Sequence, residues 1–307
     1  MTLVVFGSVN MDLVSRTSRL PAAGETILGS DFYTTPGGKG ANQAVAIARL
    51  GWPTQMVGRV GNDAFGPELL AALHQAGVDT RGVVVDDAAH SGVAIITVAD
   101  TGENQIIGVL GANDRLDQSD IQRLSTQLMG AKLLLLQLEI PIAIAQAAAQ
   151  AAQQAGVKVM LDPAPVPPVS LAPLYPLVDF LLPNEVEASQ LVGFPVTSPT
   201  TAAHAAAHLQ QQGAQTVIIK LGAQGAYCAT RTDSFFVPAF AVSAIDTVAA
   251  GDAFAGGFAT AIAEGLPLDQ AVRWGCAAGA LATTKVGAQT AMPDRPTFDS
   301  FLSQHST

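Results

Sequence analysis

Cysteine is almost absent from this chain, which has two cysteines, Cys228 and Cys276, among 307 residues. Two thiols cannot form the disulfide framework of a small secreted domain, so the composition excludes that class of protein. A reducing compartment is the default for such a chain. We therefore expect a cytoplasmic protein.

Charge is also scarce, since charged residues make up 13% of the chain and the net charge is −10. This acidic balance argues against a nucleic-acid-binding surface and against a surface that binds anionic membranes. It does not exclude a phosphate-bearing ligand, because local backbone dipoles and a metal ion can outweigh the net charge. The apolar fraction of 49% predicts a large buried core.

Long hydrophobic segments are missing as well. The first six residues are apolar, but they lack a basic region and meet Gly7 too soon for a signal peptide. The run from Ala253 to Ala263 is too short to cross a bilayer and is typical of a core helix. We expect no membrane association.

The common nucleotide fingerprints are absent, because neither G-x-x-x-x-G-K-[ST] nor G-x-G-x-x-G occurs in the chain. A different glycine-rich segment, Pro36 to Gln43, opens a predicted helix that ends at Gly51. Its three glycines suggest close backbone approach to a polyhydroxy ligand, and the Asn42 amide can both donate and accept hydrogen bonds. On local pattern alone, a plain loop and helix cap remains an alternative.

Apolar strand-like runs alternate with helix-like segments through most of the chain, most regularly after residue 117. Such βα units predict one α/β domain over 1–307, with three α/β/α layers and a mostly parallel central sheet. Ligands bind at the carboxyl ends of such strands. Polar residues collect there after several predicted strands: Asn10, Asp12, Glu139, Asp162, Asn184 and Glu187.

Two inserted segments, about 12–36 and 91–111, have the alternating pattern of antiparallel strands with turn signals. We expect them to form a small β-sheet that lies as a lid over the ligand edge. Such a sheet would have one half-apolar face, which bound ligand or a partner subunit would cover.

The stretch 244–257 carries the strongest chemical signal. Small residues at Ala249, Ala250 and Gly251 precede an apolar helix, whose free N–H groups and dipole favour an anionic guest. Asp252 lies in the same first turn, so a carboxylate stands beside an anion-accepting backbone pocket. A base beside an anion hole suits phosphoryl transfer to an alcohol. In isolation, an Asp that only stabilises the helix N-terminus is the favoured interpretation, and the rest of the chain shifts the balance toward the base.

Asn184 and Glu187 are one helical turn apart, and an amide with a carboxylate can hold magnesium through water. The alternative is an ordinary acidic helix N-terminus. The turn from Gly222 to Gly225 follows a buried strand and allows backbone to approach phosphates, although the pattern is weak evidence alone.

Together these segments resemble the ribokinase-type sugar kinases of the phosphofructokinase-B superfamily, over almost the whole chain. The two family signatures are similar to 37–42 and to 246–254, in the right order and spacing. Within the superfamily, the runs at 111–113, 136–141, 162–165, 183–185 and 285–289 are most similar to the ribokinases.

The resemblance implies ATP-dependent phosphorylation of a pentose at its primary hydroxyl, from D-ribose to D-ribose 5-phosphate. It implies Asp252 as the base and the 249–252 backbone as the anion hole, with Mg²⁺ held through Asn184 and Glu187. The implied sugar-binding residues are Asn10, Asp12, Gly38, Lys39, Asn42, Glu139 and Asp252. The implied nucleotide-binding residues are Asn184, Lys220, Gly222, Gly225, Gly251 and Cys276.

The resemblance also implies a monovalent cation, usually K⁺, beside the anion hole, and a homodimer that pairs through the lid. The positions matching the cation site are Asp246, Val248, Ala282, Lys285, Gly287 and Ala291. Lys220 departs from the Thr common in ribokinases and is similar to some sugar-acid kinases; Cys276 and Ala291 also differ from common choices.

A kinase is the favoured interpretation, and two alternatives to a ribokinase stay open. Another kinase of the superfamily would act on deoxyribose, a ketohexose, a sugar acid such as 2-keto-3-deoxygluconate, or a nucleoside. A non-catalytic sugar or nucleotide sensor on the same scaffold would be expected to lose the base, and Asp252 is present. An NAD-dependent enzyme lacks its fingerprint here.

Overall fold

The computed structural model describes residues 1–305, and its centre is a nine-stranded sheet in the order β13-β12-β11-β10-β9-β8-β1-β4-β5. The strands from β11 to β5 pair in parallel, and β12 and β13 add an antiparallel edge. The strands are β1 (Thr2–Phe6), β4 (Thr54–Gly61), β5 (Asp79–Asp86), β8 (Ala131–Leu136), β9 (Lys158–Leu161), β10 (Phe180–Leu181), β11 (Thr216–Lys220), β12 (Gly225–Ala229) and β13 (Ser234–Pro238).

The central strands are apolar on both faces because helices cover both sides of the sheet. In β1, Leu3 and Val5 belong to one buried cluster, whereas Val4 and Phe6 belong to the other. The predicted three-layer α/β/α class is confirmed. The helices are α1 (Lys39–Arg49), α2 (Phe65–Gln75), α3 (Gln118–Gln127), α4 (Ile142–Gln154), α5 (Glu185–Val192), α6 (Pro199–Gln211), α7 (Ala250–Glu264), α8 (Leu268–Thr283) and α9 (Arg295–Gln304).

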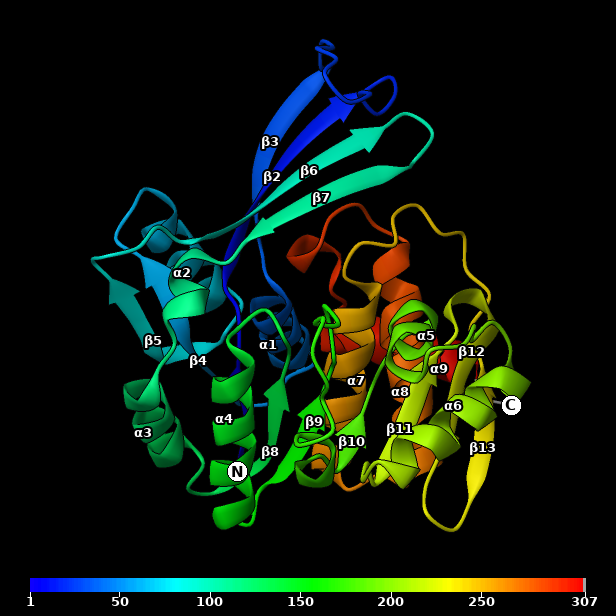
Figure 1. The fold of residues 1–307 in the computed structure, drawn as a ribbon. Helices are drawn as coiled ribbons and strands as arrows, with labels where there is room; N and C mark the ends of the chain where they lie inside the picture. The colour runs from blue at the N-terminus through cyan, green and yellow to red at the C-terminus, as the bar shows by residue number, and fades with distance from the viewer. Residues whose placement is uncertain (306–307) are drawn as a thin grey trace.

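Helices α1, α2, α7 and α8 contribute to the first cluster, and α3 to α6 contribute to the second. The parallel strands point their carboxyl ends toward the side from which a second, smaller sheet projects (Figure 1). The residues that come after these strands therefore share one edge, as expected for an open α/β sheet.

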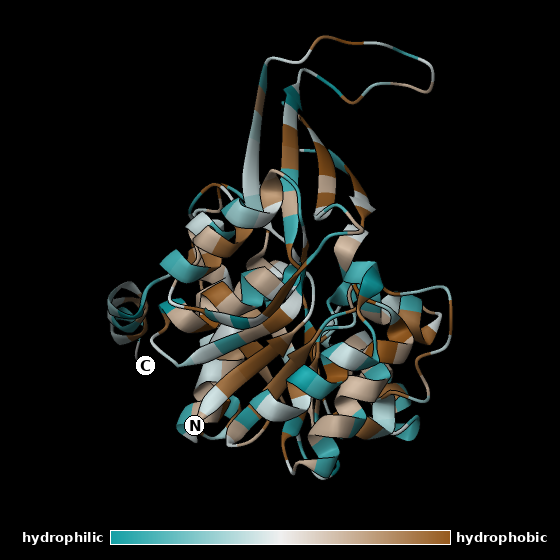
Figure 2. Ribbon diagram, turned by 90° about the vertical axis from the view of Figure 1, so that its left-hand side faces the viewer, coloured by the Kyte–Doolittle hydropathy of each residue, from teal (hydrophilic) through white to brown (hydrophobic). Residues whose placement is uncertain are grey.

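The smaller sheet has four strands in the order β3-β2-β6-β7. Its strands are β2 (Asn10–Thr17), β3 (Asp31–Gly37), β6 (Gly92–Ala99) and β7 (Asn104–Val109). The separate small sheet predicted from segments 12–36 and 91–111 is confirmed. It stands away from the main body, and apolar and polar residues follow one another along its strands (Figure 2).

The sequence pattern did not identify β5, which lies at the edge of the large sheet beside β4. Its side chains are largely half-buried or exposed, with Val85 45% exposed, so it lacks the continuous apolar run of a central strand. Strand β13, at the opposite edge of the sheet, is likewise half-exposed, and the sequence pattern did not delimit it. Edge strands carry the weakest hydrophobic signal because one side of each is solvated.

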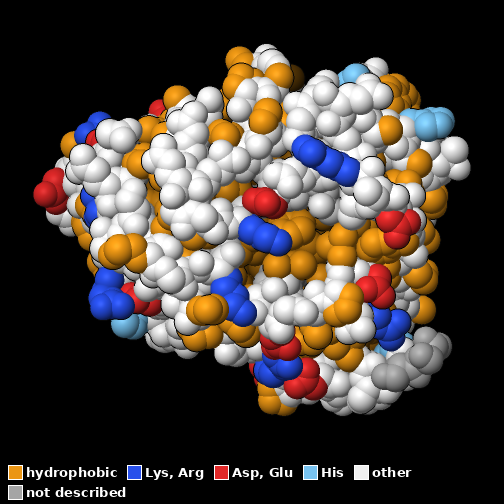
Figure 3. Space-filling model, turned by 90° about the horizontal axis from the view of Figure 1, so that it is seen from below, with side chains coloured by type: hydrophobic (Ala, Val, Ile, Leu, Met, Phe, Trp, Pro, Cys, Tyr) orange, Lys and Arg blue, Asp and Glu red, His pale blue; other side chains and the backbone are white. Residues whose placement is uncertain are grey.

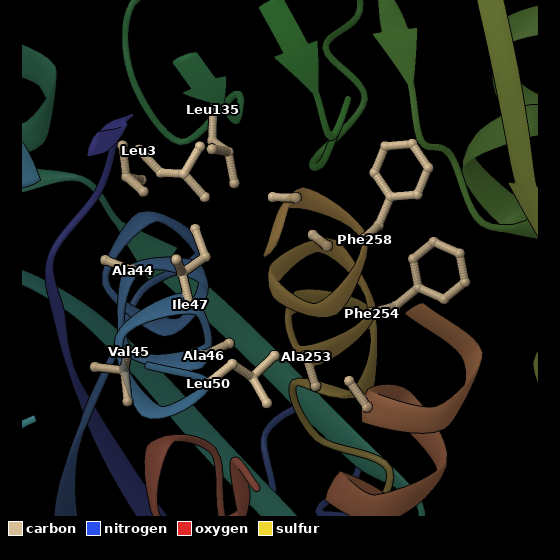
Figure 4. Packing of buried hydrophobic residues seen from close by; sticks show 14 of the residues in the cluster. Leu3, Ala44, Val45, Ala46, Ile47, Leu50, Leu135, Ala253, Phe254 and Phe258 are labelled. Atoms are coloured by element: carbon tan, nitrogen blue, oxygen red, sulfur yellow. The ribbon is translucent and has the colours of Figure 1, made fainter. Parts of the chain in front are cut away.

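Helices α1 and α7 lie side by side with very close backbones (Figure 4). A Cβ atom placed on Gly256 of α7 would come within 2.4 Å of the Ala46 Cβ of α1. Any larger residue at position 256 would push the helices apart. Because both signature segments begin these helices, this contact fixes them relative to each other.

Cys228 and Cys276 are free and buried. No helix within residues 1–305 is long and apolar enough to cross a membrane. On the face opposite the small sheet, acidic and basic side chains are interspersed, without a large patch of one sign (Figure 3).

Candidate active site

A cavity of about 570 Å³ opens where α5, β11, α7 and α8 meet. All the residues predicted to bind nucleotide lie on its wall, and so do Lys39, Glu187 and Asp252. Most of the remaining wall is made of small or apolar residues: Ala223, Ala239, Phe240, Ala241, Val242, Ala244, Ala249, Ala250, Phe254, Gly279 and Ala280.

The start of α7 forms one end of this cavity. Ala249 precedes the helix in the left-handed conformation (φ 57°, ψ 12°), and no other non-glycine residue in 1–305 has positive φ. Such a conformation is costly for Ala and occurs mainly where function or packing requires it. The Ala253 N–H makes the first helical bond, to the Ala249 carbonyl at 2.9 Å. The Ala250 N–H donates a longer hydrogen bond, to the Thr247 carbonyl at 3.3 Å, whereas the N–H groups of Gly251 and Asp252 remain available to an anion.

Asp252 is buried in the first turn of α7, and two amides from α1 hold its carboxylate. Asn42 Nδ2 donates to Oδ2 (3.0 Å), and Gln43 Nε2 donates to Oδ1 (3.1 Å). Burial raises the pKa of the Asp252 carboxyl; the Lys39 ammonium, 4.0 Å from Oδ1, opposes that shift. A fixed carboxylate with a raised pKa has the properties of a general base.

Lys39 lies between three carboxylates. Burial alone would lower the pKa of its ammonium, but the charges of Asp252, Asp162 and Glu139 outweigh burial and raise it. The ammonium is 3.9 Å from Asp162 Oδ2, and the backbone N–H of Lys39 donates to Glu139 Oε2 (3.1 Å). The side chain is therefore a permanent cation at the junction of the two signature helices.

Glu139 organises a polar cluster between β1, β2 and α1. Its Oε2 accepts hydrogen bonds from Ser8 Oγ (2.5 Å) and from Asn10 Nδ2 (3.4 Å), as well as from the Lys39 backbone. Asn113 Nδ2 donates to Asn10 Oδ1 (2.7 Å) and so orients the Asn10 amide. These contacts place the predicted sugar residues Asn10, Glu139 and Lys39 in one network.

Asn42 has one amide atom engaged and one without a partner. Its Oδ1 is buried and accepts no hydrogen bond from any residue in 1–305. A buried acceptor without a donor is costly, so this atom favours a ligand that brings a hydroxyl group.

Asp12 is another buried carboxylate among the residues predicted to bind the sugar. Burial is the main cause that raises its pKa to about 7, and the nearby charges of Glu139 and Asp252 add to the shift. Gly37 packs against this carboxylate, because a Cβ atom there would lie 2.3 Å from Asp12 Oδ2. The group thus changes protonation close to neutral pH.

The glycine-rich loop before α1 is needed for packing within the chain. A Cβ on Gly38 would come within 2.7 Å of the Asn10 nitrogen, and one on Gly40 within 2.7 Å of the Ser8 nitrogen. Gly38 also has φ 88°, which disfavours any other residue. The close approach predicted for a ligand thus also occurs between this loop and the loop after β1.

Asn184 and Glu187 form a capping box at the start of α5. Glu187 Oε2 accepts the Asn184 backbone N–H (2.8 Å), and Glu187 Oε1 accepts from Asn184 Nδ2 (2.9 Å). Burial, followed by the charge of Asp162, raises the pKa of Glu187, whereas Lys220 opposes the shift. The helix-N-terminus interpretation is therefore realised in the structure, although both side chains also face the cavity.

The residues predicted for a monovalent cation come from two loops that Asp246 joins. Its carboxylate accepts the backbone N–H groups of Val248 (3.0 Å) and Gly287 (2.9 Å). Ala282 lies in the last turn of α8, and its carbonyl accepts the Lys285 N–H at 3.3 Å. Ala291 is buried at the end of the same loop.

The remaining residues predicted to bind nucleotide are two glycines with unusual backbone conformations and one buried cysteine. Gly222 and Gly225 have positive φ and flank the short turn after β11. A Cβ on Gly225 would lie 2.1 Å from the Val237 carbonyl, so glycine is required there by packing. Burial raises the pKa of the Cys276 thiol to about 12, which makes this wall residue unreactive.

Sequence reasoning assigned no role to several residues that the structure places in the site. Ser8, Gln43, Asn113 and Gln137 lie in its hydrogen-bond network, and Asp162 pairs with Lys220. Asp162 and Gln137 were recognisable as polar residues at strand ends. Asn113 gave no such signal, because its partner Asn10 is more than 100 residues away.

Comparisons with known proteins agree with this geometry. The model of the pfkB family carbohydrate kinases matches residues 1–295. The ribokinase of Haemophilus influenzae is 40% identical over 301 residues, which are 98% of each chain. The deoxyribokinase of Salmonella typhi is 35% identical over 303 residues, 99% of each.

A solved structure of Arabidopsis thaliana ribokinase, complexed with ribose and ATP, superimposes with a TM-score of 0.88. It is 35% identical and covers 98% of both chains. The family predicted from the two signatures is thus confirmed. The chain belongs to the pfkB family of carbohydrate kinases, phosphotransferases that act on a sugar with ATP.

Proposed function

We propose that this enzyme transfers the γ-phosphoryl group of ATP to the primary hydroxyl of D-ribose, giving D-ribose 5-phosphate and ADP. One observation carries the proposal: the buried carboxylate of Asp252 lies between a polar pocket and a cavity of nucleotide size. The names of the ribokinase relatives support ribose as the sugar.

Asp252 acts as the general base in this proposal. It takes the proton of the primary hydroxyl while that oxygen attacks the γ-phosphorus, and ADP leaves from the opposite side. The N–H groups of Ala250, Gly251 and Asp252 receive the negative charge of the transferred group. The left-handed Ala249 aims this helix start at the cavity.

The sugar hydroxyls bind to the polar cluster around Glu139. Asn10, Asp12, Asn42 and Glu139 supply side-chain acceptors and donors, and Gly38 and Lys39 supply backbone at the start of α1. The buried Asn42 Oδ1, which lacks a donor within 1–305, accepts one hydroxyl. A compact polyhydroxylated pentose suits this set better than an aromatic nucleoside does.

Magnesium fits the nucleotide end of the site. Asn184 and Glu187 face the cavity, and each carboxylate oxygen of Glu187 retains a lone pair beyond its capping-box bond. Within residues 1–305, no three His, Cys, Asp or Glu side chains cluster as metal ligands. Mg²⁺ usually keeps several of its water ligands and is held by only one or two protein carboxylates, which fits this arrangement. Bound Mg²⁺ neutralises phosphate charge.

A monovalent cation, K⁺ by family resemblance, fits between the two loops that Asp246 joins. Carbonyl groups there would be the main ligands, and the cation would steady the loop that leads into α7. The predicted positions are Asp246, Val248, Ala282, Lys285, Gly287 and Ala291.

We further propose that the small sheet acts as the lid and pairs two subunits in a cytoplasmic homodimer. Every residue of β7 is exposed, including Ile106 (58%) and Ile107 (63%), and Phe32 on β3 is 62% exposed. An exposed apolar edge strand of this kind favours pairing with a second copy.

Deoxyribose is the second candidate substrate, because the Salmonella typhi deoxyribokinase matches the chain over its whole length. A ketohexose, a sugar acid or a nucleoside is less well supported. Lys220 is the feature that favours a sugar acid. A non-catalytic sensor does not explain why Asp252 is held by two amides.

The test is an ADP-release assay with ATP, Mg²⁺ and K⁺ against a panel of acceptors. The panel contains D-ribose, 2-deoxyribose, fructose, fructose 6-phosphate, 2-keto-3-deoxygluconate and adenosine. We expect D-ribose to give the highest kcat/KM. A leading sugar acid would show that the sugar side is assigned wrongly, whereas no turnover with any acceptor would contradict the kinase proposal.

A further inference from the structure

The ion pair between Asp162 and Lys220 has no part in the function proposed so far. Asp162 follows β9 and is only 1% exposed, and Lys220 ends β11. Lys220 Nζ donates to Asp162 Oδ1 at 3.1 Å. Isolated buried carboxylates are costly, so this one depends on its cationic partners.

Gln43 connects this pair to the base. Its Nε2 donates one hydrogen bond to Asp162 Oδ2 (3.0 Å) and one to Asp252 Oδ1 (3.1 Å). Gln137 Nε2 donates to Gln43 Oε1 (2.6 Å), and this bond keeps the Gln43 NH₂ group turned toward the two carboxylates. A single amide therefore holds Asp162 and Asp252 at a set separation.

Lys220 also reaches the anion hole. A Cβ atom on Gly251 would lie 3.5 Å from Lys220 Nζ, and both residues line the cavity. The ammonium is thus beside the backbone that receives the transferred phosphoryl group in the proposed reaction. Asp162 holds it there, and its other oxygen faces Lys39 at 3.9 Å.

We propose that Asp162 is a positioning residue that fixes the Lys220 ammonium beside the anion hole, where Lys220 contacts the transferred phosphoryl group as a catalytic residue. The pair also sets the electrostatic environment of the base. Without substrates, the ammonium groups of Lys39 and Lys220 balance part of the negative charge of the surrounding carboxylates, which are Asp162, Asp252, Glu139 and Glu187. Loss of either member of the pair breaks that balance next to Asp252.

This inference rests on the proposed phosphoryl transfer but not on the identity of the sugar. The test therefore uses the acceptor that the wild-type enzyme turns over fastest. Three variants are compared: Lys220→Met, Asp162→Asn and the double variant. Steady-state kinetics give kcat and the KM of each substrate, kcat is measured from pH 5 to 9, and calorimetry gives ATP affinity independently of turnover.

We expect Lys220→Met to lower kcat by roughly 10²-fold or more and to weaken ATP binding, with little change in sugar KM. It removes the nearer of the two ammonium groups that face Asp162 and leaves only Lys39, at 3.9 Å. The net negative charge near Asp252 then rises, so the base becomes harder to ionise and the acid limb of the pH profile should move to higher pH. The charged groups facing the base are Lys39 on α1, Asp162 after β9, Asp12 on β2 and Lys220 on β11.

The double variant also removes the Asp162 charge that Lys220 no longer offsets. It should therefore recover about tenfold in kcat over Lys220→Met, and its acid limb should return toward that of the wild type. Asp162→Asn keeps the shape of the side chain but removes its charge. The kcat of that variant should fall, and the acid limb of its kcat–pH profile should move to lower pH, opposite to the shift in Lys220→Met. Arg295→Met, which breaks an ion pair with Glu264 outside the cavity, is the control and should leave the limb unmoved.

Three results would overturn the proposal. The first is a kcat of the double variant that is no higher than that of Lys220→Met, together with an acid limb of the kcat–pH profile that stays at the wild-type pH in all three variants. The second is unchanged ATP affinity in Lys220→Met. The third result applies if Lys220→Met does not fold. In that case the proposal is overturned if Asp162→Asn has the wild-type kcat and the acid limb of its kcat–pH profile lies at the wild-type pH. Absence of kinase activity in the wild type would contradict the proposed function instead, and ATP affinities would still test the pair.

Discussion

The two sides of Asp252 are built in different ways. On the sugar side, buried polar side chains hold one another, as Glu139 does with Ser8 and Asn10. On the nucleotide side, the wall is mostly small or apolar residues and backbone, as at Gly222 and Val242.

This contrast indicates where selectivity resides. A pocket of fixed hydrogen-bonding groups rejects a ligand that leaves one of them unpaired, because buried polar groups are costly without partners. A smooth apolar wall distinguishes ligands mainly by shape. We therefore expect substitutions on the sugar side to change specificity and KM. Substitutions of the apolar wall side chains on the nucleotide side should have small effects.

The largest effect is expected at the boundary between the two sides. Asp252→Asn keeps the shape of the side chain but removes the base, so kcat should fall by roughly 10²–10⁴. Sugar affinity, measured by calorimetry, should change little. A variant with near-wild-type turnover would remove Asp252 from the mechanism.

Sugar-side substitutions should come next. Asn42→Ala or Glu139→Ala should raise the sugar KM by roughly 10–100-fold, the loss expected for one charged or buried hydrogen bond. The KM for ATP should change far less. If both KM values rose equally in these variants, the sugar assignment would be wrong and the contrast between the two sides would fail.

Asp12 allows the sugar side to be probed through pH. Its pKa of about 7 means that the carboxyl is mostly protonated below pH 7 and mostly ionised above it. An ionised carboxylate accepts more hydroxyl hydrogen bonds, so the sugar KM should rise severalfold between pH 8 and pH 6. Asp12→Asn should flatten that dependence over the same range, and a persisting slope would assign the titration to another group.

The same group affects folding stability with a definite sign. Because the folded-state pKa of Asp12 is raised from 3.8 to about 7, the folded protein binds this proton more tightly than the unfolded chain does. Its contribution to stability is therefore present below pH 4 and is lost as pH rises through 7. Urea unfolding of Asp12→Asn against the wild type at pH 5 and pH 8 measures it, and the stability difference should favour the variant more at pH 8.

The smallest effect is expected at Cys276. Its side chain contributes only a part of the apolar cavity wall. Cys276→Ala should therefore change the ATP KM by less than about threefold and leave the sugar KM unchanged. A larger loss would show that the nucleotide side depends on specific side chains after all.

Features that depend on local patterns were predictable from the sequence. The three-layer fold came from alternating βα units, and the small sheet came from turn signals between alternating runs. The sequence pattern did not identify β5 and did not delimit β13, because exposed side chains, such as Val85 of β5, weaken the apolar pattern of both strands. The first turn of α7 was predictable because small residues and Asp252 are adjacent in the chain.

The polar network could not be predicted in this way, because its partners are far apart in sequence. Gln43 and Asp162 are 119 positions apart, and Gln43 and Asp252 are 209 apart. Gln43 closes the glycine-rich segment that opens α1, but nothing in that segment indicates which distant carboxylates its amide contacts. The close packing of α1 on α7 at Gly256 brings Gln43 to Asp252, and Asp162 reaches the same amide from the end of β9.

Our central proposal about specificity is that side-chain hydrogen bonds on the sugar side select D-ribose. It is tested by kcat/KM for D-ribose and for 2-deoxyribose, measured side by side on the wild-type enzyme at saturating ATP with Mg²⁺ and K⁺. We expect D-ribose to lead by at least about tenfold, since deoxyribose leaves a buried polar group unpaired. Equal values, or a lead for 2-deoxyribose, would contradict this conclusion.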